Sequence, residues 1–84
     1  MANDLKDQIF DYLVKDELLN YTDYDIETIK NETEIAELGL DSLDMMETIM
    51  GAEEKYNIEI QDDDFEHVKT VGELVEVIYN NMRV

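Results

Sequence analysis

The sequence predicts an all-α fold: a small four-helix bundle with three main helices, one short third helix and a long loop between helices 1 and 2. Three observations favour it. Apolar residues recur at helical spacing in three separate segments. The length of 84 residues suits one domain over residues 1–84. The hydrophobic content of 44% is normal for a chain that folds around a core.

The first predicted helix begins at Asn3 or Asp4, either of which can cap a helix, and ends near Leu19 after roughly four turns. Its apolar residues form two neighbouring stripes with a spacing of four: Leu5, Ile9 and Leu13, and beside them Phe10, Val14 and Leu18. Such a face is expected to pack against the rest of the domain.

Residues 20–40 show no sustained period and predict a long irregular connection, a feature that is often functional in a small domain. We expect its apolar residues to hold it against the helices, and part of it to form a short helical turn. These residues are Tyr21, Tyr24, Ile26, Ile29, Ile35, Leu38 and Leu40.

The second helix is expected from about Ser42 to Tyr56. On a helical wheel with ~100° steps, one arc of this segment is apolar. The arc contains Ala52, Met45, Tyr56, Ile49, Met46, Met50 and Leu43. Glu54, Glu47 and Asp44 follow directly beyond Met50 and Leu43, whereas Glu53 falls inside the arc, a position that a purely structural helix would not favour.

Residues 57–61 predict a helix stop followed by a short extended piece, with Ile58 and Ile60 facing one way. Three aspartates at 62–64 can cap a short helical turn that carries Phe65 and Val68. The last helix has the clearest start signal, because Thr70-Val71-Gly72-Glu73 fits a capping box. The apolar residues that follow at helical spacing are Val71, Leu74, Val75, Ile78 and Met82.

The composition is strongly acidic, with 23 Asp and Glu against 6 Lys and Arg and a formal net charge of −17. A field of this sign repels nucleic acid and anionic membranes and attracts cationic partners. Because the negative charges also repel one another, we expect added salt to stabilise the fold.

The absence of cysteine excludes disulfides and thiolate metal sites. No apolar run approaches membrane-spanning length, and the start Met-Ala-Asn-Asp lacks the features of a secretory leader. We therefore expect a cytoplasmic monomer with no membrane insertion, no nucleic-acid partner and no metal site.

The most informative motif is Asp41-Ser42-Leu43, which stands where the irregular segment turns into the second helix. A helix N-terminus offers unpaired backbone N–H groups and a positive dipole end, so it suits a phosphate. A serine before a helix is also a common cap that has no chemistry. The surrounding residues must decide between an attachment site and a plain cap.

The order of helix, long loop, Gly-x-Asp-Ser-Leu, acidic helix, short helix and final helix resembles that of acyl carrier proteins over nearly the whole chain. The matching positions are Asp41-Ser42-Leu43-Asp44, Glu47, Met50, Glu53-Glu54, Ile58-Glu59-Ile60 and Thr70-Val71. The resemblance implies that Ser42 is esterified by 4′-phosphopantetheine from coenzyme A, whose thiol holds acyl groups as thioesters. It also implies a carrier, not an enzyme, with no catalytic residues of its own.

By the same resemblance, the second helix is the surface that enzymes recognise: phosphopantetheinyl transferase, acyltransferases, ketosynthases and other acyl-processing enzymes with a basic patch. The expected partner surface contains Asp41, Leu43, Asp44, Glu47, Met50, Glu53 and Glu54. Exposed apolar side chains beside one sign of charge suit transient docking. Because Asp41 and Asp44 would repel a phosphate, we expect them to serve partners rather than the cofactor. Met46, Ile49, Ala52 and Tyr56 should face inward, in a core that in this family can open to shelter an acyl chain.

Three other functions deserve comparison. Gly39-Leu40-Asp41-Ser42-Leu43 approaches a Gly-Asp-Ser-Leu hydrolase motif and Asp64-Phe65-Glu66-His67 supplies an Asp-x-x-His, but Leu40 interrupts the first motif and that fold needs alternating strands and helices in a longer chain. His67 is expected at the surface of the short third helix.

A calcium-binding loop is the second alternative. Five of its ligand positions are filled, by Asp23, Asp25, Glu27, Asn31 and Glu34, yet Thr28 stands where such a loop requires glycine. The third alternative is an acidic interaction domain without covalent modification.

Departures from the common carrier pattern leave the pathway open. Leu40 stands where alanine often precedes the motif, Gln61 where proline is common, and Met45 where a small polar residue is usual. Gly51 should cost the second helix about 1 kcal/mol relative to alanine. These differences allow a fatty-acid or polyketide carrier, or a discrete peptidyl or aryl carrier of another specialised pathway.

Overall fold

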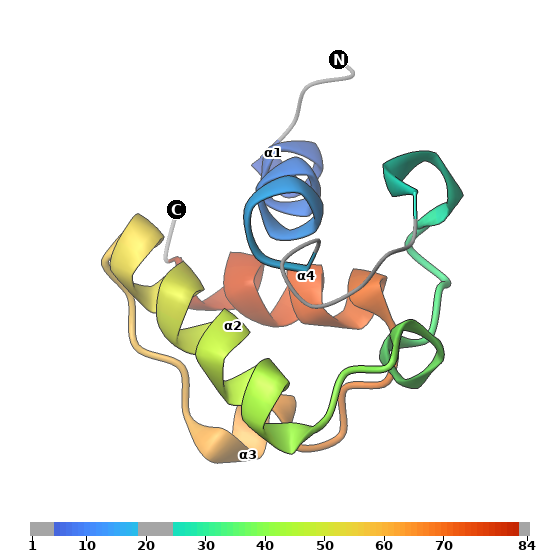
Figure 1. The fold of residues 1–84 in the computed structure, drawn as a ribbon. Helices are drawn as coiled ribbons and strands as arrows, with labels where there is room; N and C mark the ends of the chain where they lie inside the picture. Colours follow the sequence, from blue (N-terminus) through green and yellow to red (C-terminus); the bar gives the residue numbers. More distant parts are fainter. Residues whose placement is uncertain (1–4, 19–24, 83–84) are drawn as a thin grey trace.

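The computed structural model describes residues 5–18 and 25–82 (Figure 1). Its helices are α1 (Leu5–Tyr12), α2 (Ser42–Tyr56), α3 (Asp62–Phe65) and α4 (Val71–Asn81). A π-helical turn at Leu13–Glu17 continues α1, and two short 3₁₀ turns lie at Ile26–Thr28 and Ile35–Leu38. The all-α prediction is confirmed, since the described residues contain four helices and no strand. None of the described helices has the length and apolarity needed to span a membrane.

The core forms where α1 crosses α4, with α2 packed against the turn that continues α1 (Figure 1). The side chains of Ile9, Leu74 and Ile78 are fully buried at this crossing. At the surface, Lys6 and Glu76 join the same two helices through an ion pair of 2.6 Å. Exposed pairs of this kind contribute little to stability, so the apolar contacts hold the two helices together.

The first helix differs from the regular helix that its sequence predicts, because its second half is π-helical. A π-helical turn changes the register, so that Leu13, Val14 and Leu18 are all fully buried. Glu17, at the end of this turn, reaches the surface of α2 at Gly51. The predicted caps at Asn3 and Asp4, and the predicted end at Leu19, lie outside the described residues.

The long connection is fastened to the start of α4 by backbone hydrogen bonds. Ile35 N donates to Lys69 O over 2.8 Å, Val71 N to Thr33 O over 3.0 Å, and Gly72 N to Asn31 O over 2.8 Å. A Cβ atom at position 72 would lie 2.9 Å from Asn31 O, so the approach requires a glycine. Residues 31–35 of the connection, which we call the loop wall, are therefore held against the start of α4.

The apolar residues of the connection behave as predicted wherever the structure describes them. Ile29, Ile35 and Leu38 are buried, and Leu40 packs partly buried against the core. The 3₁₀ turn at Ile35–Leu38 is the expected short helical turn, and Gly39 ends it with φ 81°. Tyr21 and Tyr24 lie outside the described residues.

The later elements also match the sequence. Helix α2 occupies the predicted range and stops at Asn57, which adopts a left-handed conformation (φ 56°). Ile60 is buried and Ile58 is partly buried against the core. At the start of α4, Glu73 N donates to Thr70 Oγ1 over 3.1 Å and Thr70 N donates to Glu73 Oε1 over 3.2 Å. The predicted capping box is thus confirmed.

Candidate functional site

The candidate site lies at the first turn of α2, where Ser42 is the first helical residue and is exposed. Asp41 is the N-cap: Asp44 N donates to Asp41 Oδ1 over 2.9 Å, and Asp41 N donates to Asp44 Oδ2 over 3.3 Å. These reciprocal bonds form a capping box in which an aspartate takes the place usually filled by glutamate or glutamine. The two acids beside Ser42 therefore have a structural role that the sequence interpretation missed.

The capping box also fixes which backbone donors remain at the helix start. It uses the N–H groups of Asp41 and Asp44, which an anion could otherwise have bound. Among the described residues, no hydrogen bond joins the Ser42 side chain to another side chain. The site can present an exposed serine for modification.

A groove of about 660 Å³ opens beside Ser42. It runs between the loop wall, the first two turns of α2 and the segment around α3, which lies beside the start of α2 in Figure 1. Its apolar lining consists of Ile35, Ala36, Leu40, Met45, Met46, Phe65 and Val68. Its polar lining consists of Glu34, Asp41, Ser42, Glu66 and Lys69. An extended group with both amide and apolar parts would fit such a surface.

The residues predicted to shelter an acyl chain do not form this groove as a set. Ile49 and Ala52 are buried in the core, and Tyr56 is half-buried. Met46 lines the groove but is 49% exposed, so the prediction that it faces inward is wrong. The reason is that Thr48, omitted from the predicted apolar arc, takes an inward position. It is fully buried because its hydroxyl donates to Asp44 O over 2.9 Å.

Sequence reasoning missed most of the residues that line the groove. Phe65 and Val68 come from the short third helix and its exit, and Leu40 from the loop. The only signal available was their apolar character in otherwise acidic segments, which does not show that they face Ser42. Met45 was placed in the apolar arc, and the structure adds that it lines the groove.

The predicted partner residues fall into two groups. Leu43, Met46 and Met50 are the large apolar side chains that the described structure leaves exposed, by 62%, 49% and 60%. They follow one another at helical spacing along α2, and we call them the apolar stripe. Glu47 and Glu54 are exposed on the same helix. Apolar side chains beside carboxylates thus line one side of α2, as the sequence predicts for Leu43 and Met50 but not for Met46.

Glu53 belongs to the second group, because its carboxylate faces the chain that leaves α2. Ile60 N donates to Glu53 Oε2 over 2.8 Å, and Glu53 is half-buried. This bond satisfies a backbone donor next to the buried Ile60. It explains why Glu53 lies inside the apolar arc, and it gives this predicted partner residue a structural role.

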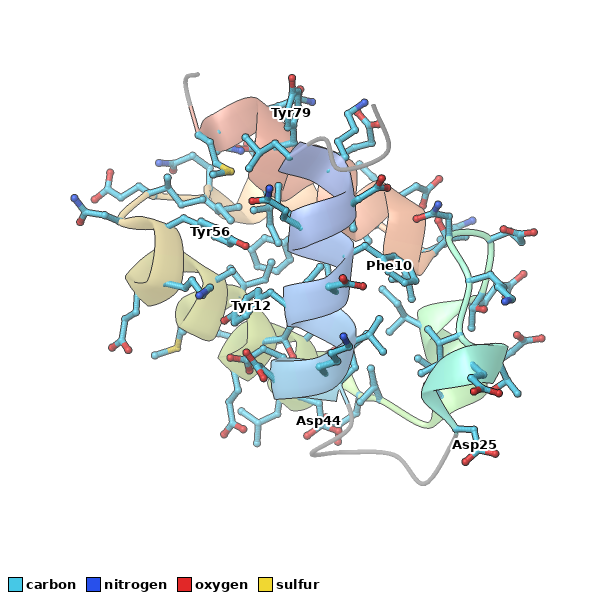
Figure 2. The ribbon with its side chains drawn as sticks, turned by 90° about the horizontal axis from the view of Figure 1, so that it is seen from above. Phe10, Tyr12, Asp25, Asp44, Tyr56 and Tyr79 are labelled. Carbon is cyan, nitrogen blue, oxygen red and sulfur yellow. The ribbon has the colours of Figure 1, made fainter. Side chains whose placement is uncertain are left out.

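An aromatic contact joins the C-terminal end of α2 to the end of α1. Tyr12, the last residue of α1, and Tyr56, the last residue of α2, meet edge to face with ring centroids 5.6 Å apart; both are labelled in Figure 2. The Tyr12 hydroxyl donates to Glu17 Oε2 over 2.8 Å. Burial, and then this bond, raise the pKa of Tyr12, while burial followed by the charge of Asp16 raises the pKa of Tyr56. Both tyrosines stay neutral and support the position of α2.

Two alternative sites find no support in the geometry. Among the described residues, no group of three or more histidine and acidic side chains is arranged to hold a metal ion; Asp23 of the possible calcium loop lies outside them. His67 is exposed in the turn after α3. The described residues form helices and turns without the alternating strands that the hydrolase fold requires.

Comparison with known proteins agrees with this geometry. The model of the family described as "Phosphopantetheine attachment site" matches residues 13–78, most of the chain. The chain belongs to the acyl carrier protein family. It is 42% identical to the acyl carrier protein of Wolinella succinogenes over 69 residues, which cover 81% of this chain and 91% of that protein. The acyl carrier protein of Sulfurovum sp. is 38% identical over 68 residues, 80% of this chain and 91% of the relative. That of Phenylobacterium zucineum is 39% identical over 66 residues, 77% and 84% respectively.

The family fixes the general chemistry of this carrier. Its prosthetic group is 4′-phosphopantetheine, and its role is to carry acyl groups rather than to catalyse a reaction. Acyl carrier proteins act with biosynthetic enzymes in general. The cofactor supplies the thiol, so a chain without cysteine can hold thioesters.

Proposed function

We propose that Ser42 is the residue that carries 4′-phosphopantetheine in this protein. The observation that supports it most strongly is position: Ser42 is exposed, begins α2 and opens onto the groove. Exposure lets a modifying enzyme reach the hydroxyl and supply the catalytic groups. The groove offers an apolar floor with a polar rim beside the attachment point, so the residues present fit an arm that has both characters.

The chain's own contribution to attachment is presentation. The Asp41–Asp44 capping box holds the first turn of α2 in one conformation, so the serine hydroxyl is offered in a fixed position. Both carboxylates carry negative charge next to Ser42 and disfavour a phosphate lying along the helix start. The phosphodiester is therefore directed away from these two acids, towards solvent or the groove.

Attachment is tested by mass. The purified chain is incubated with coenzyme A and a broad-specificity phosphopantetheinyl transferase, and the intact protein is weighed. We expect the gain of one phosphopantetheine group, and no gain in Ser42→Ala. No gain in the unsubstituted chain, or an equal gain in Ser42→Ala, would overturn the assignment. Circular dichroism of the variant checks that it still folds.

We further propose that the apolar stripe and its neighbouring acids dock the transferase, acyltransferases and ketosynthases through a basic patch on each. Charge complementarity supports this, because a net charge of −17 steers cationic surfaces towards the chain. Leu43 and Met50 supply apolar contact, while Asp44, Glu47 and Glu54 supply charge. Predicted roles in docking for Asp41 and Glu53 would come in addition to their backbone bonds.

The docking proposal needs variants that remove charge without removing the cap. Asp44→Asn keeps an oxygen that can accept the Asp41 N–H bond, and Glu47→Gln changes an exposed residue. We expect each to slow modification of Ser42 about threefold at low salt, and less at high salt. The matched control is Asp11→Asn, the same loss of charge on the exposed side of α1. Equal slowing by the control would indicate a net-charge effect and contradict a local docking site.

The proposal also concerns the acyl group that the prosthetic group carries. We infer a fatty-acid or polyketide acyl group, since relatives named acyl carrier protein match this chain and the groove lining is mainly apolar. Entry of the chain among Ile49, Ala52 and Tyr56 stays a prediction, without the exposed Met46. Acylated forms of increasing chain length, compared by thermal unfolding, would test it: burial raises the melting temperature with each added methylene, whereas a solvated chain leaves it unchanged. The expected cytoplasmic location and monomeric state also stay predictions.

A further inference from the structure

The apolar stripe of α2 has an unusual chemical composition. Two of its three members, Met46 and Met50, are methionines, and they stand four residues apart on one face of the helix. Their thioethers are the oxidisable groups of an exposed surface that has no cysteine. The other described methionines differ, since Met45 and Met82 are partly buried and pack against the core.

We propose that Met46 and Met50 form a modification site, at which oxidation by a hydroperoxide switches off the docking surface of α2. This rests on the proposed docking function of the apolar stripe. In the reaction, a sulfur lone pair attacks one oxygen of the hydroperoxide, the O–O bond breaks and an S–O bond forms. The hydrogen on the transferred oxygen passes to the remaining oxygen, which leaves as water or an alcohol. The thioether loses two electrons to become a sulfoxide, and the peroxide is reduced.

Exposure makes these two positions the preferred targets. Met46 is 49% exposed and Met50 is 60% exposed, so a peroxide reaches their sulfurs without any opening of the fold. Met45 and Met82 are less exposed, because their side chains pack against the core, so they should react more slowly. Oxidation at moderate peroxide concentration should therefore be selective by rate, and it should leave the packing of the domain intact.

The consequence follows from what a sulfoxide does to a contact surface. It replaces a flexible apolar group with a polar one that prefers water. With both methionines oxidised, Leu43 alone would keep the apolar character of the stripe. Small numbers of apolar anchors dominate the energy of docking, so we expect binding of partner enzymes to weaken by roughly tenfold.

The experiment treats the folded apo chain with hydrogen peroxide and maps the sulfoxides by peptide mass. The rate of Ser42 modification by the transferase, at carrier concentrations below saturation, is then measured before and after treatment. We expect sulfoxides at Met46 and Met50 first and a rate that falls by about tenfold. Two methionine sulfoxide reductases, one for each sulfoxide epimer, with a dithiol reductant should restore the rate, because together they return the thioethers, oxidise the dithiol to a disulfide and release water.

Variants show which sulfurs are responsible. Each is compared with itself before and after peroxide, so a change in its own starting rate does not matter. The double variant Met46→Leu/Met50→Leu should show no loss after peroxide, whereas Met82→Leu should show the full loss. An unchanged rate in the oxidised chain, or an equal loss in the double variant, would overturn the proposal. Failure of the untreated chain to gain phosphopantetheine would instead overturn the function of Ser42, so the two outcomes are distinguishable.

Discussion

Gly72→Ala tests whether the loop wall beside the groove depends on a glycine. Gly72 lies in the first turn of α4, where its N–H donates to Asn31 O over 2.8 Å. An added Cβ atom would lie 2.9 Å from Asn31 O and 3.0 Å from Asn31 Cβ. Real Cβ atoms do not approach a backbone oxygen so closely, so the loop has to move away from α4.

The size of the effect is the difference between two opposing terms. Alanine is favoured over glycine in a helix by about 1 kcal/mol, which would stabilise the variant. Displacing the loop weakens the bond to Asn31 O and the neighbouring bond from Val71 N to Thr33 O, at about 1 kcal/mol each. The net result is a loss of about 1 kcal/mol of unfolding free energy. For a domain of this length it lowers the melting temperature by about 4–8 °C.

Urea unfolding followed by circular dichroism measures the free energy, and amide hydrogen exchange locates the change. The matched control is Gly51→Ala in α2, where the added Cβ would overlap the carboxylate of Glu17 rather than backbone. That flexible side chain can move away, which breaks its hydrogen bond with Tyr12. The free energy lost with this bond and the helix stability gained from alanine should cancel to within about 0.5 kcal/mol. If Gly72→Ala is as stable as wild type or more so, with the Val71 and Gly72 amides still protected, the reasoning is refuted.

Three further predictions concern caps and pH. Thr70→Ala removes the acceptor of the Glu73 N–H and should cost about 1 kcal/mol in urea unfolding, with α4 amides exchanging faster; an unchanged midpoint would contradict the capping role. Backbone bonds from Lys69 and Thr70 lower the pKa of Glu73 from its ordinary 4.5, so its contribution is present above that pH and is lost as pH falls. Glu73→Gln should therefore flatten the acid side of the stability curve, and a curve of unchanged slope would argue against it. Burial first, then Glu17, raise the pKa of Tyr12 above 10.0, so its contribution is present below pH 10.0 and is lost as pH rises further. Tyr12→Phe should reduce that alkaline loss but not abolish it, since Tyr56 titrates in the same sense; Phe10→Leu, which removes no titrating group, should leave it unchanged.

Much of the fold could be predicted from local sequence signals. The bounds of α2 and the capping box of α4 follow from residues within a few positions of each other, and both are confirmed. The π-helical turn after α1 could not be predicted, because the spacing of Leu13 and Val14 fits a regular helix equally well. Its register depends on packing against α2 and α4.

The candidate site could also be predicted from the sequence only in part. Ser42 and the exposed Leu43 and Met50 could be identified from the motif and the helical wheel. Met46 was placed inside because a helical wheel assigns side chains to the core by their hydrophobicity alone. The wheel cannot show that Thr48 is buried, with its hydroxyl bonded to the backbone of α2 itself. Glu53 could not be recognised as the acceptor of the Ile60 N–H, because Ile60 lies beyond the end of α2 and the helical wheel does not place it.

The sequence by itself determined the helical class, the acidic charge, the family and the position of the serine at a helix start. The class, the charge and the position of the serine depend on composition and on periodicity within single segments, whereas the family follows from the resemblance of the Asp-Ser-Leu motif and its surrounding residues to acyl carrier proteins. Only the tertiary structure decided that residues 34–36, 40–42, 45–46, 65–66 and 68–69 line one groove. It also decided that two glycines mark close approaches, and which methionines stay in solvent. The physical reason is that such features arise from contacts between distant segments, and a local pattern does not encode which segments meet.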